Sequence, residues 1–144
     1  MATFRLAAVL RARHAQEEAA KAAVVRARAE AYQAAVRVRA LERDLDGRPV
    51  PDAASAAAFS ATMSARNALA GALNAAIDMS RLAEDVVQER INDLTDAAVQ
   101  RRIIEKLEEH HAAARRRTAE AEDAKAVDDL TTAAHRRRIE EQHP

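Results

Sequence analysis

The sequence predicts an all-α protein with the fold of an elongated antiparallel two-helix coiled coil, that is, a helical hairpin with a candidate bend near Gly71. Aromatic residues make up only 2% of the 144 residues, and the hydrophobic share of 49% is carried largely by alanine. Because alanine buries little area, a thick globular core is not expected. Charged residues at 32%, with two glycines and three prolines, favour long helices joined by a seam one or two side chains wide. We treat residues 1–144 as a single hairpin domain.

The first helix is expected over residues 3–46. Its apolar heptad places these residues in the seam: Leu6, Leu10, Ala20, Val24, Ala27, Ala31, Ala34, Val38, Leu41 and Leu45. Arg13 and Glu17 occupy the same heptad positions but are charged. Charges and alanines at this end of the seam predict one of three outcomes for the two helices there: they are loosely held, they lie close together, or they fray. Tyr32 falls outside the seam and should flank it.

The one clear break lies at residues 46–52, and we predict a turn over residues 47–54. Gly47 can adopt the left-handed conformation that closes a helix. Pro49 and Pro51 cannot continue a helix, because proline lacks the backbone N–H and its ring clashes with the preceding turn. Asp52 or Ser55 can then cap the N-terminus of a second helix, expected over residues 55–141.

The second helix keeps a heptad over the following residues: Phe59, Met63, Arg66, Ala70, Leu73, Ile77, Ser80, Glu84, Val87, Ile91, Leu94 and Ala98. Beyond it the apolar residues move to Val99, Ile103 and Leu107, in steps of four that predict a stutter. Gly71 costs about 1 kcal/mol relative to alanine inside a helix, so a bend there is one alternative and an unbroken helix the other. A bend would fold the chain toward three helices.

The two predicted helices differ in length. At ~1.5 Å per residue, the first spans roughly 65 Å and an unbroken second helix roughly 130 Å. Residues 1–46 carry a net charge of +3 (nine basic, six acidic) and residues 49–100 carry −4 (three basic, seven acidic), which favours their lying side by side. The first helix then covers the second to about Val99, and the stretch from Arg101 to Arg138 projects at least in part.

Catalytic and metal-binding signals are weak throughout the chain. Two isolated glycines cannot build a phosphate-binding loop, and no two of the five histidines have the i, i+3 or i+4 spacing of helical metal ligands. The acidic pairs Glu108–Glu109 and Asp128–Asp129 diverge by about 100° on a helix, so they do not converge on one substrate atom. We therefore expect no enzyme, no cofactor and no small-molecule substrate.

The basic runs at residues 115–117 and 136–138 are flanked by acids and lack interleaved aromatics, so we expect no nucleic-acid partner. Such alternating charge is better suited to docking on another protein. The chain has no cysteine and no apolar run of 18 residues, and the N-terminal residues contain no continuous apolar segment. A soluble, cytoplasmic protein is expected.

Three segments together resemble one protein family. The opening FRLAAVLRARHAQEE, the later RRIIEKLEEHH with Arg102, Glu105, Lys106 and Leu107, and the KAVDDL that follows are similar to the N-terminal, Arg-x-x-Glu-Lys-Leu and Asp-Glu-Leu-Ala elements of the FliJ family. Members of that family are small coiled-coil proteins of the flagellar type III export apparatus. The order and separation match over nearly the whole chain, although Asp129 replaces the usual Glu and Thr131 the usual Ala.

The resemblance implies an antiparallel coiled coil similar to the central stalk of rotary ATPases. Such a protein engages the export ATPase ring, promotes its assembly, and links it to the export gate protein and to export chaperones at the inner face of the membrane. On this resemblance, Arg102, Glu105, Lys106, Asp128 and Asp129 are expected to contact the ATPase. Two residues near the turn, Phe59 and Met63, are candidates for the gate, although their heptad positions also suit the seam. The alternative is a structural coiled coil that self-associates through the uncovered part of the second helix, without an export role.

Overall fold

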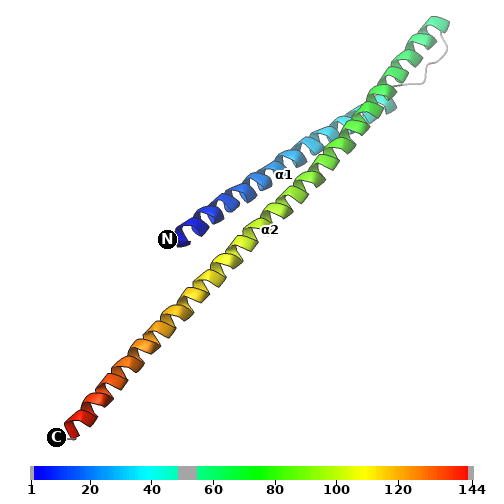
Figure 1. Ribbon diagram of the computed structural model, residues 1–144. Helices are drawn as coiled ribbons and strands as arrows, with labels where there is room; N and C mark the ends of the chain where they lie inside the picture. The colour runs from blue at the N-terminus through cyan, green and yellow to red at the C-terminus, as the bar shows by residue number, and fades with distance from the viewer. Residues whose placement is uncertain (1, 49–54, 143–144) are drawn as a thin grey trace. The chain divides into compact units, whose positions relative to one another are not determined.

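The computed structural model describes the backbone of residues 2–48 and 55–142 and the side chains of residues 6–48 and 55–139. It contains two helices, α1 (Ala2–Asp46) and α2 (Ala56–Gln142), shown in Figure 1. They run antiparallel and pack against each other as a helical hairpin, which confirms the predicted fold class.

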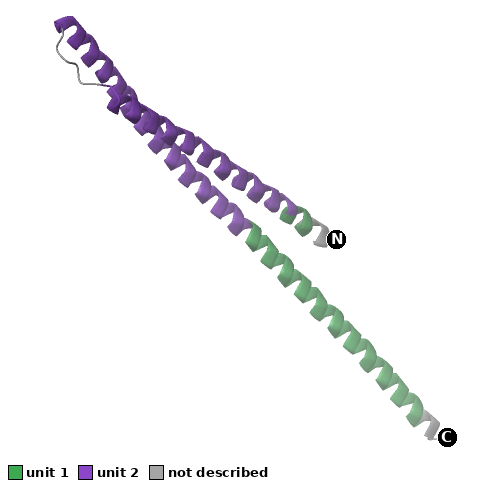
Figure 2. Ribbon diagram, turned by 180° about the vertical axis from the view of Figure 1, so that it is seen from behind, with its two compact units in different colours: residues 1–10, 101–144 green, residues 11–100 purple. Residues whose placement is uncertain are grey.

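The chain divides into two compact units, coloured separately in Figure 2. Residues 11–100 form the hairpin unit, which holds most of α1 and the first half of α2. Residues 1–10 and 101–144 form the terminal unit, which holds the start of α1 and the second half of α2. Each unit is described separately below.

Helix α1 ends without a left-handed glycine. The Gly47 amide donates to the Arg43 carbonyl at 2.9 Å, and the Arg48 amide donates to the Leu45 carbonyl at 3.4 Å. No glycine in the described part of the chain has a positive φ, so the predicted conformation of Gly47 is wrong. The Arg48 amide instead bonds to the carbonyl three residues earlier, as in a 3₁₀-helix. This bond ends α1 without a residue in the left-handed conformation. Of the predicted turn, residues 49–54 lie outside the described residues.

Helix α2 begins at a serine cap. The Ser55 hydroxyl accepts the Ala58 amide at 3.1 Å, and the Ser55 carbonyl accepts the Phe59 amide at 3.0 Å. The hydroxyl satisfies an amide that has no carbonyl partner within the helix, which is why serine is favoured there, and the carbonyl accepts the first i−4 bond of α2. The prediction of Ser55 is confirmed, and the alternative, Asp52, lies outside the described residues.

The seam of the hairpin unit follows the predicted heptad on α1. Every predicted seam position from Arg13 to Leu45 is buried or half-buried, whereas Tyr32 is 61% exposed, as expected for a flanking residue. The centre is made of small side chains, with Val24, Ala27 and Ala76 exposed by 7% or less. One hollow is lined by α1 residues from 20 to 30 and by Val86, Arg90 and Asp93 of α2, so these parts of the two antiparallel helices lie side by side.

At the charged end of the seam, the two helices lie close together rather than being loosely held. Glu17 is only 8% exposed, and its carboxylate lies 3.4 Å from the Lys21 ammonium. Lys21 also donates a hydrogen bond of 2.7 Å to Glu18, which is the main reason that the pKa of Lys21 is raised above 10.5. Neighbouring alanines, such as Ala20, allow the helices to approach here, and the ion pair offsets part of the cost of burying Glu17.

Helix α2 passes through Gly71 without interruption, so the three-helix alternative is wrong. The stutter is wrong as well. The half-buried positions of α2 keep the steps of three and four through Leu94, Ala98, Arg101, Glu105, Glu108 and Ala112. Val99, Ile103 and Leu107 are each about half exposed, on a different face of the helix. Because α2 is unbroken, the steps of three and four continue along one face regardless of which residues occupy it.

Replacing Glu17 with leucine is expected to raise the free energy of unfolding by about 1–2 kcal/mol, because a well-packed apolar side chain avoids the desolvation cost of a buried carboxylate. Urea unfolding followed by circular dichroism measures this change. Glu18→Leu is the matched control, since the Glu18 side chain is 70% exposed, and it should change stability by no more than about 0.5 kcal/mol. Destabilisation by Glu17→Leu would contradict the expectation.

Gly71→Ala should stabilise the protein by about 0.5–1 kcal/mol, because alanine loses less backbone entropy in a helix. A Cβ added at Gly71 meets no atom within 4 Å, so no steric cost opposes the gain. Thermal unfolding provides the measurement. At Gly47 the added Cβ would lie 3.2 Å from the Arg43 carbonyl oxygen, so Gly47→Ala should gain less. An equal gain at both sites would argue against this account.

Candidate protein-binding surface

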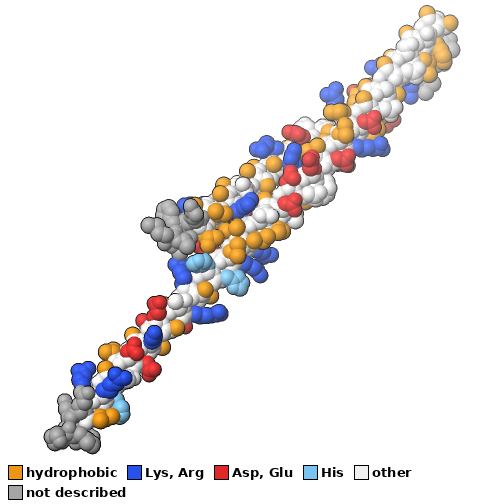
Figure 3. Space-filling model, viewed as in Figure 1, with side chains coloured by type: hydrophobic (Ala, Val, Ile, Leu, Met, Phe, Trp, Pro, Cys, Tyr) orange, Lys and Arg blue, Asp and Glu red, His pale blue; other side chains and the backbone are white. Residues whose placement is uncertain are grey.

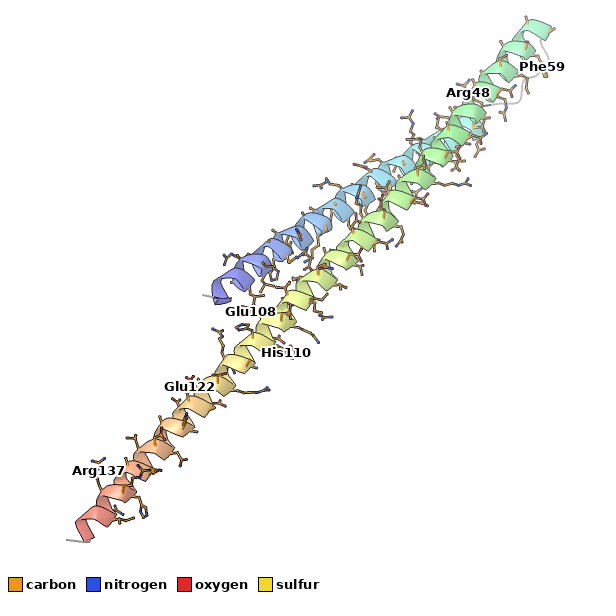
Figure 4. All side chains as sticks on the ribbon, viewed as in Figure 1. Arg48, Phe59, Glu108, His110, Glu122 and Arg137 are labelled. Atoms are coloured by element: carbon orange, nitrogen blue, oxygen red, sulfur yellow. The ribbon has the colours of Figure 1, made fainter. Side chains whose placement is uncertain are left out.

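The second half of α2 carries a long, fully exposed helical surface in the terminal unit. Every side chain from residue 114 to residue 139 is exposed. Figure 4 shows two of them, Glu122 and Arg137, standing out from the helix. The cause is length, because α1 has 45 residues and α2 has 87. We call residues 114–139 the exposed segment.

The start of the terminal unit is partly covered. Leu6 and Leu10 of α1 are half-buried, as are Arg101, Ile104 and Glu105 of α2. Arg101 donates a close hydrogen bond to Glu105 one turn later, so this carboxylate is held within the helix surface. Arginine and glutamate at i, i+4 are natural helical partners.

A shallow hollow follows directly on the same helix. It has alanines on its floor and mainly carboxylates around it, and it is lined by Glu105, Glu108, Glu109, Ala112, Ala113 and Arg116. Three carboxylates within two turns produce a local negative potential. The hollow is therefore suited to a basic side chain of another protein.

The exposed segment alternates in charge along its length. Figure 3 shows basic and acidic side chains following one another along this part of α2. In chain order the charges are Arg115–Arg117, then Glu120, Glu122 and Asp123, then Lys125, then Asp128 and Asp129, then Arg136–Arg138. Charge blocks of opposite sign favour one register of a docked partner and disfavour others by like-charge repulsion.

The predicted contact residues of this unit fall into two groups. Arg102 and Lys106 are exposed and lie one turn apart on one face, whereas Glu105 is two-thirds covered and paired with Arg101. Asp128 and Asp129 are exposed but diverge by about 100° around the helix. They lie about 39 Å along α2 from Arg102, at ~1.5 Å per residue, so a single small partner surface does not reach both groups.

The predicted residues near the turn belong to the hairpin unit. Phe59 is 45% exposed in the first turn of α2, and Met63, one turn later, is half-buried. Met63 thus occupies its seam position, whereas Phe59 offers an aromatic surface to solvent, labelled in Figure 4. The structure does not test a binding role for either residue.

The family model described as Flagellar FliJ protein matches residues 1–140 of the chain. The chain belongs to the FliJ family. No individual curated protein and no solved structure matches it. FliJ proteins are non-catalytic coiled-coil components of the flagellar export apparatus, so this chain is an export component and not an enzyme.

Other properties of this FliJ chain concern metals and membranes. Within the described ranges, 2–48 and 55–142, no three His, Asp or Glu side chains are grouped so that they could hold a metal ion. Neither described helix has a segment both long and apolar enough to cross a bilayer.

Several apolar residues of this FliJ chain lie on the surface, within the stretch from Arg101 to Arg138 that the sequence predicts to project at least in part. Val127 is 61% exposed and Leu130 is 68% exposed, within the exposed segment, and Ile103 and Leu107 precede them. Their spacing alone does not distinguish a buried seam from an unpaired face of a helix. These residues add apolar contact area beside the charge blocks.

Amide hydrogen exchange should separate the exposed segment from the seam of FliJ. A helix without packing partners is marginal in water, so amides of residues 114–139 should exchange far faster than those of residues 20–40. Mass spectrometry of peptic fragments after deuterium labelling gives both rates in one sample. Equal protection of the two regions would contradict the view that the exposed segment lacks a partner in the free protein.

Proposed function

We propose that this FliJ protein is a stalk that engages the export ATPase ring, promotes its assembly, and links it to the export gate protein and export chaperones. The observation that carries the proposal is the complete exposure of residues 114–139 in a member of this family. A helix that long is ordinarily stabilised by burying one face. A ring that surrounds the helix would provide that burial.

The ATPase contact is proposed for the charged residues of the terminal unit. Arg102 and Lys106 present two basic groups to solvent, and Asp128 and Asp129 present two acidic groups further along the helix. Glu105 contributes indirectly, by fixing Arg101 and by adding negative charge to the hollow that it lines. Charges of both signs on one helix suit a partner surface that also presents charges of both signs.

The gate contact is proposed for Phe59, with Met63 behind it. An exposed aromatic side chain is a favourable anchor for a partner pocket, because it buries a large area with few rotatable bonds. The proposed location is the cytoplasmic side of the membrane at the flagellar base, where the export gate and the ATPase are both within reach.

Charge reversal tests the ATPase contact. The double variant Arg102→Glu/Lys106→Glu should lower stimulation of the export ATPase by about tenfold or more, because both charges lie where a partner would meet them. The rate of ATP hydrolysis is measured against the concentration of added protein, and circular dichroism verifies that helicity is kept. Asp128→Lys/Asp129→Lys, tested separately, should reduce stimulation through the second group.

Arg81→Glu is the matched control, because the Arg81 side chain is 76% exposed and lies in the hairpin unit away from the proposed contact. It should leave stimulation unchanged. Stimulation should also weaken as salt is raised, since exposed charges are screened. Full stimulation by both helical double variants would reject the proposed contact.

A further inference from the structure

A second apolar seam runs along α2 within the hairpin unit, on a face that α1 does not fill. Its residues recur in alternating steps of three and four: Ala58, Ala61, Ala65, Ala68, Ala72, Ala75, Met79, Leu82 and Val86. All are exposed except Ala65, which is half-buried. We call this the outer seam. Over the same stretch the half-buried positions of α2 include the polar residues Arg66 and Ser80, so the outer seam is more uniformly apolar than the face that packs on α1.

The outer seam carries large side chains that a lone hairpin leaves in water. Met79 is 62% exposed, Leu82 58% and Val86 37%. Sustained spacing of three and four over four heptads is the pattern of a coiled-coil contact. A contiguous apolar surface of this kind marks an interaction site more often than a solvated face.

The outer seam is continuous with the interface between α1 and α2. Leu69, Ala76 and Ala83 border it on one side, and all three are half-buried or buried in the hairpin. A hollow at its centre is lined by Ala34 and Arg37 of α1 together with Ala72, Ala75, Ala76 and Met79 of α2. A further helix laid along the outer seam would therefore extend an existing helix–helix interface.

We propose that a second copy of this chain occupies the outer seam, with the two α2 helices antiparallel about a two-fold axis between Ala72 and Ala75. In this register every large residue meets an alanine. In each layer a residue of one chain faces a residue of the other chain. The layers are Ala72 with Ala75, Ala68 with Met79, Ala65 with Leu82, and Ala61 with Val86. Large side chains opposite small ones keep the distance between the helices uniform.

A parallel pair would not have this property. It would place Met79, Leu82 and Val86 opposite themselves at one end and only alanines opposite alanines at the other. Helix pairs approach to about 8 Å with small side chains and about 10 Å with large ones, so the two ends would require different separations. The antiparallel register removes this conflict.

The charges beside the outer seam are compatible with the same register. On the side away from α1 the seam is bordered by Ser64, Gly71, Asp78 and Asp85. The two-fold axis sets Ser64 near Asp85 and Gly71 near Asp78 of the other copy, so no like charges face each other there. The seam ends at Glu89, which would meet Ala58. None of the residues proposed for the ATPase contact belongs to the outer seam, so either proposal can fail without the other.

Sedimentation velocity over a range of concentrations tests the self-association. The full chain should show a concentration-dependent dimer, and Leu82→Glu should raise the dissociation constant by about tenfold or more while keeping helicity. Leu130→Glu is the matched control, because Leu130 is 68% exposed, against 58% for Leu82, but lies outside the outer seam. A monomer at all concentrations overturns the proposal, even if a helix of another protein binds this face.

Cysteine cross-linking tests the register, and the chain has no cysteine of its own. An equimolar mixture of an Ala68→Cys chain and a Met79→Cys chain should form disulfides mainly between the two different chains on oxidation. Both positions are exposed, so neither change should unfold the hairpin. Cross-linking of Ala68→Cys chains to themselves in preference to the mixed product would indicate a parallel pair and overturn the antiparallel arrangement.

Discussion

The close approach of two helices along an alanine-rich seam is the constraint on which this structure depends. Val24, Ala27 and Ala76 form its best-buried part, and none is larger than valine. Each buried methylene-sized group contributes only about 0.8 kcal/mol, so a seam of small residues must be long to hold two helices together. The length of the helices in the hairpin unit is thus a consequence of the size of the residues that join them.

The same seam explains why a carboxylate is tolerated at its edge. Glu17 is only 8% exposed at a seam position followed one turn later by Ala20, and the Lys21 ammonium at 3.4 Å compensates part of its charge. A seam of leucines would hold the helices further apart and could not cover this position in the same way. Burial of a charge here reflects narrow spacing rather than a catalytic purpose.

Helix α2 has more apolar faces than α1 can cover. Within the hairpin unit, α1 takes the inner face and leaves Met79, Leu82 and Val86 in solvent; in the terminal unit, nothing covers residues 114–139 among the described residues. Both surfaces remain helical because alanine, arginine, lysine and glutamate are strong helix formers, but the exposed segment is only marginally stable in water without a partner. Membership of an export apparatus gives such surfaces a use, since a component of an assembly is completed by its neighbours.

The sequence by itself determined the helical class, the break near Gly47 and the seam of α1, and it narrowed the cap of α2 to Asp52 or Ser55, because each depends on local chemistry or on a repeat of about two turns. It also carried the family resemblance through Arg102, Glu105 and Lys106. Which apolar stripe of α2 faces inward was decided only by the tertiary structure. Val99, Ile103 and Leu107 are more apolar than Arg101, Glu105 and Glu108, yet the charged set faces inward, because an unbroken helix keeps the register that its packing over residues 66–98 imposes.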